Sequence, residues 1–290
     1  MLLALLAAPL QAENSAPLYR AVQGQALFIP LADAVDAERV SMAGRFRSSL
    51  FCRDDACYAL VAVAMDAKPG RYTDRITLAE TDGLSSAFDI TFDVIAGTFP
   101  LESFTLPESF LTFSPSVLKR VRNEQSRMRY ALSQRGKPLM LAEPFLAPVK
   151  GVVKAPFGVR RSINAKPPTR HYGVDLRCAS GDQVRATQDG TVTLTGDYYL
   201  NGRVVVINHG DALSSSYNHL SALRVTTGQP VRRGDVIGLC GATGRATGPH
   251  LHFGISIGPT PVNPLAFIAT TAAPPSLPEE SEEPESLPSR

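Results

Sequence analysis

The stretch HLHFGI, residues 250–255, decides how the C-terminal half of the chain is interpreted. Its apolar residues predict a β-strand, and side chains two positions apart in a strand point to the same face of a sheet. His250 and His252 should therefore project into one site, while Leu251 lies on the opposite face. Two imidazoles on one face of a strand are a candidate for metal binding or proton transfer.

The other histidines extend this pattern upstream. All five histidines lie between residues 171 and 252, and the first 170 residues contain none. His171 and Asp175 are four residues apart in a segment whose glycine and valine disfavour a helix, so an extended chain puts both on one face. Tyr217 and His219 repeat the two-residue spacing, which predicts a shared face for them too.

These residue types suit a catalytic zinc site. Zinc takes imidazole nitrogen and carboxylate oxygen in a tetrahedral set, and a catalytic site leaves one position to water. Two histidines and one aspartate would fill three positions, and two histidines would remain to move protons. Spacing alone does not divide the histidines between these roles. His209 precedes a turn and is expected to be structural or at a groove edge, and Tyr217 fits core packing and substrate contact equally well.

Residues 149–268 predict a compact antiparallel β domain, because short β runs alternate with glycine turns and no helix of any length is visible. The turn with Gly244, Gly248 and Pro249 leads into the HxH strand. It is not a phosphate-binding loop, since no lysine follows it and no helix opens after it. Residues 269–290 are rich in Pro, Ser, Ala and Glu and are predicted to be a disordered tail.

Residues 16–97 predict a second, smaller module that is all β, so the fold class is mainly β. Residues 60–65 are apolar on both sides and predict a central strand, whereas residues 88–94 alternate as in a half-buried strand. The turn at residues 69–72 is similar to the turn and tyrosine of immunoglobulin-like sandwiches. Such a module more often binds a partner or acts as a spacer than catalyses a reaction.

Residues 98–148 are predicted to be a linker with a basic helix. Ser114 and Pro115 form a helix start, apolar residues recur at helical spacing, and Gly136 ends the run. The polar face carries lysine and arginine. A solvated linker helix packed on one domain is favoured over a helix lying on an anionic polymer.

The N-terminus and the cysteines favour export. Residues 1–12 are almost wholly apolar and resemble a secretory signal, although a basic start is missing, and they are too short to span a bilayer. Cys52 and Cys57 flank a predicted hairpin turn, and Cys178 and Cys240 form the other pair. Disulfides are favoured over buried thiols, and neither pair has zinc-finger spacing. We expect an exported protein, periplasmic or in the cell envelope, with no stable membrane span.

Charge is uneven along the chain. The net charge is +2, and the tail after Ile268 carries five Glu and one Arg, a net of −4, which leaves about +6 for the rest by subtraction. A mildly basic body suits an anionic polymer such as a bacterial cell wall or nucleic acid. Ordinary solubilising charge explains the same count equally well.

Four runs resemble the M23 metallopeptidases, the lysostaphin and LytM type of peptidoglycan endopeptidase, over about residues 150–268. The runs are FGVRR at 157–161, HYGVDL at 171–176, YNHLS at 217–221 and GRATGPHLHF at 244–253. The resemblance implies a small antiparallel β domain with a groove over a zinc ion. It also implies that the substrate is a peptide stem or cross-link of peptidoglycan, and not nucleic acid.

Carried over by position, the resemblance implies zinc ligands His171, Asp175 and His252, and unligated catalytic histidines His219 and His250. No motif residue is missing, which favours a zinc endopeptidase for cell-wall remodelling, and we expect it to be a monomer. The alternative is a catalytically silent LytM-type protein that binds the wall or activates other hydrolases. The better guess for the scissile bond is a D-Ala to diaminopimelate cross-link. The sequence does not decide whether the N-terminal module or the basic helix covers the groove.

Overall fold

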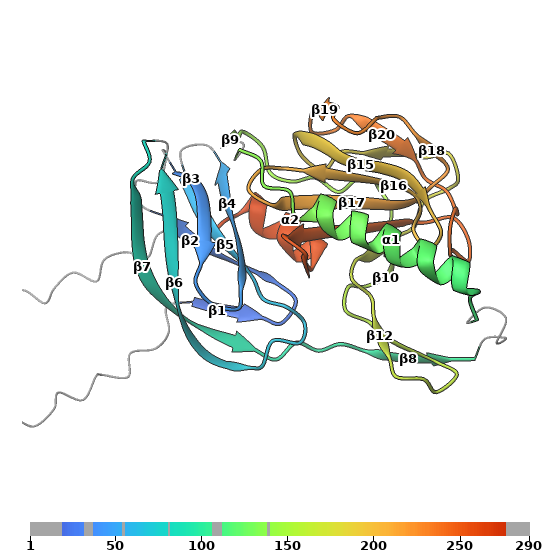
Figure 1. Ribbon diagram of the computed structural model, residues 1–290, viewed down its shortest axis with the longest axis horizontal. Helices are drawn as coiled ribbons and strands as arrows, with labels where there is room; N and C mark the ends of the chain where they lie inside the picture. The colour runs from blue at the N-terminus through green and yellow to red at the C-terminus, as the bar shows by residue number, and fades with distance from the viewer. Residues whose placement is uncertain are drawn as a thin grey trace, which may run out of the picture.

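The computed structural model describes residues 19–31, 37–53, 56–80, 82–105, 112–137 and 140–276. The signal-like segment at 1–12 and the end of the predicted tail, from residue 277, lie outside the described residues. The fold is mainly β, with an N-terminal β module, a linker that carries a helix, and a larger C-terminal β domain (Figure 1).

The N-terminal module is a sandwich of two four-stranded sheets. The first has the order β1 (Tyr19–Val22), β7 (Ser85–Ile95), β6 (Gly70–Glu80) and β3 (Ala37–Met42). The second has the order β2 (Ala26–Leu31), β5 (Ala56–Ala62), β4 (Arg47–Arg53) and β9 (Met140–Leu141). Val40, Ile76 and Phe92 of the first sheet pack against Ile29 and Val61 of the second.

Strand β5 is central, as its apolar pattern predicts. Ala59 and Val61 face the sandwich core, whereas Tyr58 and Leu60 belong to the core of the C-terminal domain. Both faces of β5 are therefore covered, which explains why this strand has no polar alternation. In the other sheet, Tyr72 on β6 donates a hydrogen bond of 2.6 Å from its hydroxyl to the carbonyl of Lys68, a contact like that of a tyrosine corner.

Both predicted cysteine pairs form disulfides. Cys52 and Cys57 are direct partners in the β4–β5 hairpin. Cys178 follows β13 (Val174–Leu176) and is bonded to Cys240, which follows β20 (Val236–Leu239). The second bridge thus joins two segments of the C-terminal domain that are 62 residues apart.

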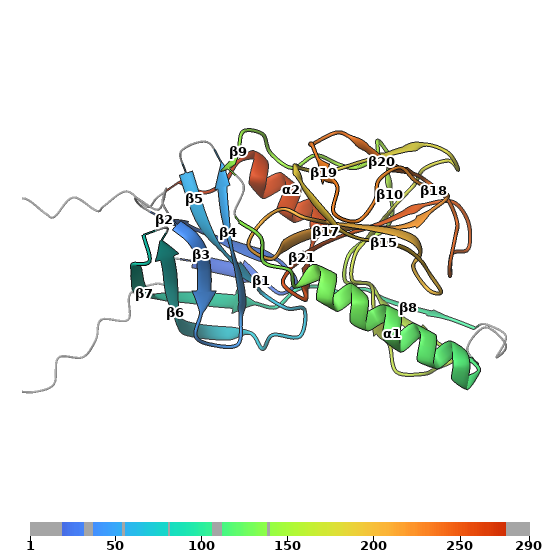
Figure 2. The ribbon, with the colours of Figure 1, turned by 45° about the horizontal axis from the view of Figure 1, so that its top comes forward.

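The linker helix α1 (Pro115–Leu132) lies along the C-terminal sheet (Figure 2). Ser114 caps it by accepting a hydrogen bond from the backbone N–H of Val117 at 3.3 Å. Ala131 and its apolar neighbours pack on Val204 and Val206 of the C-terminal sheet. In the described part of the chain, neither helix has the length and apolar character needed to cross a membrane.

The C-terminal domain is built on one large sheet, with two smaller sheets beside it. The large sheet has the order β10 (Val153–Ala155), β13, β21 (Leu251–Ile257), β17 (Leu213–Leu220), β16 (Gly202–Asn208), β15 (Gly190–Tyr198) and β19 (Pro230–Val231), with β22 (Thr260–Val262) beside β21. The smaller sheets are β14 (Gln183–Arg185) with β20 and β18 (Ala222–Leu223), and β12 (Thr169–Arg170) with β11 (Arg160–Ile163) and β8 (Leu101–Phe104). Pairing within the domain is antiparallel, and the linker strand β8 joins β11 in parallel.

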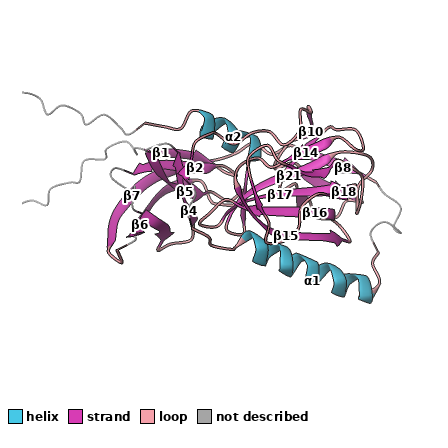
Figure 3. Ribbon diagram, turned by 90° about the horizontal axis from the view of Figure 1, so that it is seen from above, coloured by secondary structure: helices cyan, strands magenta, loops and turns pink. Residues whose placement is uncertain are grey.

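A short helix, α2 (Pro264–Ala272), corrects the prediction that this domain has no helix and that a disordered tail begins at residue 269. Asn263 caps it by accepting from the backbone N–H groups of Leu265 and Ala266. Phe267 packs against Phe28 of the N-terminal module, so α2 lies where the two parts of the chain meet (Figure 3). A nine-residue helix that is apolar on most sides has no polar stripe by which to recognise it.

Candidate metal centre

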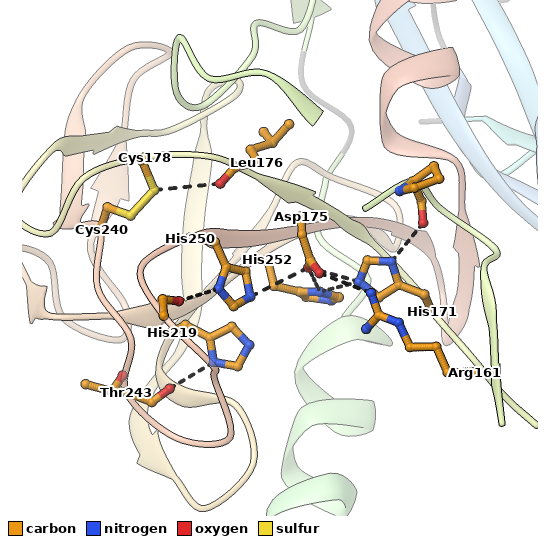
Figure 4. Close-up of polar contacts among 12 residues, drawn as sticks. Arg161, His171, Asp175, Leu176, Cys178, His219, Cys240, Thr243, His250 and His252 are labelled. Carbon is orange, nitrogen blue, oxygen red and sulfur yellow. Dashed lines mark hydrogen bonds and ion pairs between the residues drawn. A yellow bond between two sulfur atoms is a disulfide. The ribbon is translucent and has the colours of Figure 1, made fainter. Parts of the chain in front are cut away.

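Three side chains converge on one point at the edge of the large sheet. Asp175 on β13 and His252 on β21 are directly opposite each other in the antiparallel register, so their side chains share a face. The Oδ1 atom of Asp175 lies 2.9 Å from Nδ1 of His252 and 2.9 Å from Nε2 of His171. The two nitrogens are 3.0 Å apart (Figure 4).

His171 reaches the centre from the segment that follows β12. Its backbone extends the β11–β12 ladder, since its N–H donates to the Val159 carbonyl at 2.9 Å and its carbonyl accepts from the Gly158 N–H at 2.8 Å. Gly158 has a φ of 83°, and a β-carbon there would clash with the ring of Phe99. This close packing holds the ladder that positions His171.

The donor atoms fit a bound cation. Nδ1 of His171 lies 2.8 Å from the carbonyl of Pro156, which can only accept, so Nδ1 carries the hydrogen. In neutral His171, Nε2 then presents a lone pair toward an oxygen of Asp175, which is also an acceptor. In a tetrahedral zinc site with bonds of about 2.1 Å, neighbouring donor atoms lie roughly 3.4 Å apart, so a small outward shift of the three donors from their 2.9–3.0 Å spacing would admit the ion.

Asp175 is an anion in this setting. Its burial raises the pKa of the carboxyl, but hydrogen bonding and charge interaction with His171 and His252 outweigh burial and hold the pKa well below its usual range. Burial lowers the pKa of His252. A carboxylate oxygen and two imidazole nitrogens form a ligand set that zinc accepts.

Two further histidines stand beside this cluster. His219 places Nδ1 2.9 Å from the carbonyl of Thr243, and His250 places Nδ1 2.8 Å from the carbonyl of Gly248. Both Nδ1 atoms therefore carry hydrogen, and both Nε2 atoms keep a lone pair in the neutral ring. The two rings are 4.8 Å apart, and Nε2 of His250 is 3.8 Å from Oδ1 of Asp175 (Figure 4). Burial lowers the pKa of His219 to about 4.

The expected shared face of Tyr217 and His219 is wrong. Tyr217 is opposite Phe253 in the register and points into the core, while the next register position, Asn218, is opposite His252. A β-bulge separates Tyr217 from Leu220 in the pairing with β16, and His219 has a φ of 64°. The bulge turns the His219 side chain to the metal side, where strand alternation would have placed it in the core.

The structure decides the open alternatives for His209 and Tyr217 in favour of the core. The Tyr217 hydroxyl accepts from the backbone N–H of Thr187 at 2.9 Å and lies 2.9 Å from Oγ of Ser215. The same Oγ is 2.8 Å from Nε2 of His209, whose Nδ1 donates to the carbonyl of Asp189. Both rings are almost fully buried and are not part of the metal cluster.

Comparison with known proteins identifies this region. Residues 169–264 match the sequence model of Peptidase family M23. These residues form a peptidase family M23 domain. The candidate ligands and the two flanking histidines all lie inside it.

Curated relatives of the M23 domain are named as endopeptidases. The DD-carboxypeptidase/endopeptidase Mpg of Neisseria meningitidis is 40% identical over 119 residues, which are 41% of this chain and 27% of the relative. The peptidoglycan DD-endopeptidase ShyA of Vibrio cholerae is 43% identical over 95 residues, 33% of this chain and 22% of the relative. The chain thus spans about a quarter of the length of these curated relatives.

A solved structure resembles more of the chain than the M23 domain. A crystal structure from Pseudomonas aeruginosa, assigned to the M23 peptidases, is 28% identical and covers 85% of this chain and 94% of its own, with a TM-score of 0.66. The match therefore includes residues outside 169–264. It supports the mainly β architecture of both parts.

Arg161 lies between Asp175 and Glu102 of the linker, a contact that the sequence did not point to. Nη2 of Arg161 lies 3.5 Å from Oδ2 of Asp175, the oxygen turned away from the histidines, and Nε of Arg161 lies 3.6 Å from Glu102 of the linker. Arg161 on β11 is opposite Glu102 on β8 in the register. No local pattern predicts a pairing between strands about 60 residues apart, so only the tertiary structure shows it.

Proposed function

We propose that this chain is a zinc-dependent endopeptidase that hydrolyses peptide bonds in the stems or cross-links of peptidoglycan. The observation that carries the proposal is the convergence of three donor atoms, from His171, Asp175 and His252, at mutual distances of 2.9–3.0 Å. Two more imidazoles, of His219 and His250, stand next to them with Nδ1 fixed on backbone carbonyls. A ligand set with free bases beside it suits metal-assisted hydrolysis.

In this proposal, His171, Asp175 and His252 hold the metal. When bound, zinc would lower the pKa of a water molecule toward neutrality and polarise the carbonyl under attack. Arg161, beside the second oxygen of Asp175, would keep that carboxylate oriented. The hydrogen bond from His171 to the Pro156 carbonyl fixes the ring so that Nε2 faces the site.

His219 and His250 would move the protons. Each donates its Nδ1 hydrogen to a backbone carbonyl, so Nε2 is the atom free to accept a proton from the attacking water. The same Nε2 atom would then return the proton to the leaving amine. Donation from either ring would also stabilise the negative charge that develops on the carbonyl oxygen.

The relatives' names support the proposed substrate class. Two of them are peptidoglycan DD-endopeptidases, ShyA and ShyB of Vibrio cholerae. We therefore extend the proposal to a cross-link between D-Ala and diaminopimelate, cut by an exported enzyme in the periplasm or envelope. The two disulfides are consistent with an oxidising compartment.

The division of roles is tested by comparing His252→Ala with His250→Ala. The first variant should lose zinc, because it removes a ligand, and the second should keep zinc but lose turnover by about 10²–10⁴-fold, because it removes a proton carrier. Zinc is measured by metal analysis of the purified protein, and turnover by digestion of cross-linked muropeptides.

His209→Gln is the matched control, since His209 lies in the core and should not affect zinc content. Equal loss of zinc in His252→Ala and His250→Ala would contradict the division between ligands and proton carriers. If the zinc-loaded wild-type protein leaves stems and cross-links uncut, the enzyme proposal fails. The silent regulatory alternative would then be favoured.

A further inference from the structure

A cleft lies on the other side of the segment that carries His171. It has a volume of about 420 Å³, within the range of small-molecule sites. The loop at residues 65–69 of the N-terminal module forms one wall, and Arg160 and Arg170 of the β11–β12 hairpin form the other. Arg170 and His171 are consecutive in an extended segment, so their side chains point to opposite faces. The cleft and the metal centre thus lie back to back on one strand.

The cleft is positively charged. Lys68, Arg160 and Arg170 line it, and Asp66 is the one acidic residue among its lining groups, so the net charge is three minus one, or +2. In the part of the chain that the structure describes, none of the three cations forms an ion pair, and none donates a side-chain hydrogen bond to a protein acceptor. The other half-buried cations of the described residues do have such a partner: Arg53, Arg161, Arg203 and Arg233.

Arg170 is the most constrained of these cations. Its guanidinium stacks over the ring of Phe99 at 5.2 Å, which fixes its orientation. Its Nη1 atom is shielded from solvent and has no hydrogen-bond acceptor. An anion in the cleft does not reach this shielded atom, but it can accept from the remaining donors of the guanidinium, which lines the cleft and has no protein acceptor.

The walls indicate which anion fits. Met65, Pro69 and Phe99 add apolar surface next to the cations, which suits an organic acid better than inorganic phosphate. Peptides with free carboxylates combine an anionic group with short apolar side chains. We propose that this cleft binds a carboxylate group of a peptidoglycan stem peptide, as a second contact site behind the metal centre. The choice of stem peptide rests on the proposed function, whereas the preference for a carboxylate rests on the cleft.

The test is calorimetric binding of an uncross-linked disaccharide tetrapeptide to the zinc-loaded full chain. The same muropeptide with its carboxylates amidated is the comparison ligand. We expect the free-acid form to bind about tenfold more tightly, because a charge-assisted hydrogen bond to a guanidinium is lost on amidation. Arg170→Gln should abolish most of this preference, and Lys68→Gln, at the exposed rim, should reduce it about threefold.

Arg39→Gln and Lys150→Gln are the matched controls, since they remove the same charges at exposed positions away from the cleft. His252→Ala should keep the preference, because the cleft does not need the metal. Loss of the preference in His252→Ala would assign the carboxylate to the metal centre and overturn the proposal. An unchanged preference for the free-acid muropeptide in Lys68→Gln and Arg170→Gln would also overturn the proposal. If Arg170→Gln does not fold, the Lys68→Gln variant alone provides this test.

Inorganic phosphate is added as a competitor in the same titration. Displacement of the free-acid muropeptide by phosphate at lower concentration than by acetate would replace the carboxylate assignment with a phosphate one and overturn the proposal. The readout is binding and not cleavage. A protein that cuts no peptidoglycan but keeps the Arg170-dependent preference for the free acid would contradict the proposed function and leave the cleft assignment intact.

Discussion

His209 shows how burial changes the chemistry of a histidine. It lies in the core, with its ring 5.1 Å from that of Phe145 and both nitrogens occupied by Asp189 and Ser215. Burial lowers its pKa to about 4, whereas an unfolded histidine has a pKa of about 6.5. The buried ring is therefore neutral over the whole range in which the histidines of the unfolded chain become charged.

This difference predicts a pH dependence of stability. Between about pH 4 and 6.5 the unfolded state binds more protons than the folded state. The free energy of unfolding therefore rises with pH across this window and decreases as the pH falls through it. The pKa difference of His209 would make the free energy of unfolding larger at pH 7 than at pH 4 by on the order of 3 kcal/mol. Urea unfolding from pH 4.5 to 7.5 should show a shallower slope for His209→Gln than for the wild type. Parallel curves for the two proteins would contradict this account.

The elements that carry the candidate site are joined covalently. Cys178 lies three residues after Asp175, and Cys240 precedes Gly241, which forms a bridge with His250. The disulfide between them therefore ties the strand of one candidate ligand to the turn that leads to the HxH strand. The Cys52–Cys57 bridge closes only one hairpin of the N-terminal module.

Loop length predicts that the two bridges differ in their effect on stability. The sequence separations are 62 and 5 residues, and a longer closed loop restricts the unfolded chain more. Cys178→Ala/Cys240→Ala should lower the free energy of unfolding by about 4 kcal/mol and Cys52→Ala/Cys57→Ala by about 2 kcal/mol. The measurement is denaturant unfolding of both double variants against the wild type. A larger loss from the short bridge would show that native packing, and not loop closure, dominates.

Over the whole molecule, Asp211 connects three parts of the chain. Its carboxylate accepts from the backbone N–H groups of Val40 at 3.2 Å and Leu50 at 2.8 Å in the N-terminal module, and pairs with Arg135 after the linker helix. Its own backbone N–H donates to the carbonyl of Gly136 at 3.0 Å. Together with the aromatic contacts of α2, these bonds hold the two β units in one arrangement.

Asp211→Asn should therefore destabilise the whole protein. The asparagine would turn an NH₂ group toward Arg135 or toward the two N–H donors, which leaves a buried charge or donor without a partner. We expect a loss of about 2–4 kcal/mol in the free energy of unfolding. Asp89→Asn is the control, because Asp89 also pairs with an arginine but its side chain is 59% exposed, against 1% for Asp211. It should change stability by less than about 1 kcal/mol. Equal effects of the two variants would disprove the role of Asp211.

Much of this molecule could be predicted from local patterns. The mainly β class, the central strand β5, the start of α1 and the partners of both disulfides follow from hydrophobic alternation, a helix cap and the cysteine positions. Local patterns failed for α2, whose residues are apolar because two parts of the chain cover them. They also failed for Arg161 and Glu102, which meet through a pairing of distant strands.

The sequence by itself determined the candidate donor types and grouped His250 with His252 and His171 with Asp175, because side-chain direction in an extended chain depends only on the parity of the spacing. Tertiary structure decided which residues stand beside them. His219 reaches the site because a bulge with a positive φ reverses its side chain, and Asp175 meets His252 because β13 and β21 pair in that register. Bulges and register depend on strands far apart in the chain, so no local pattern contains them.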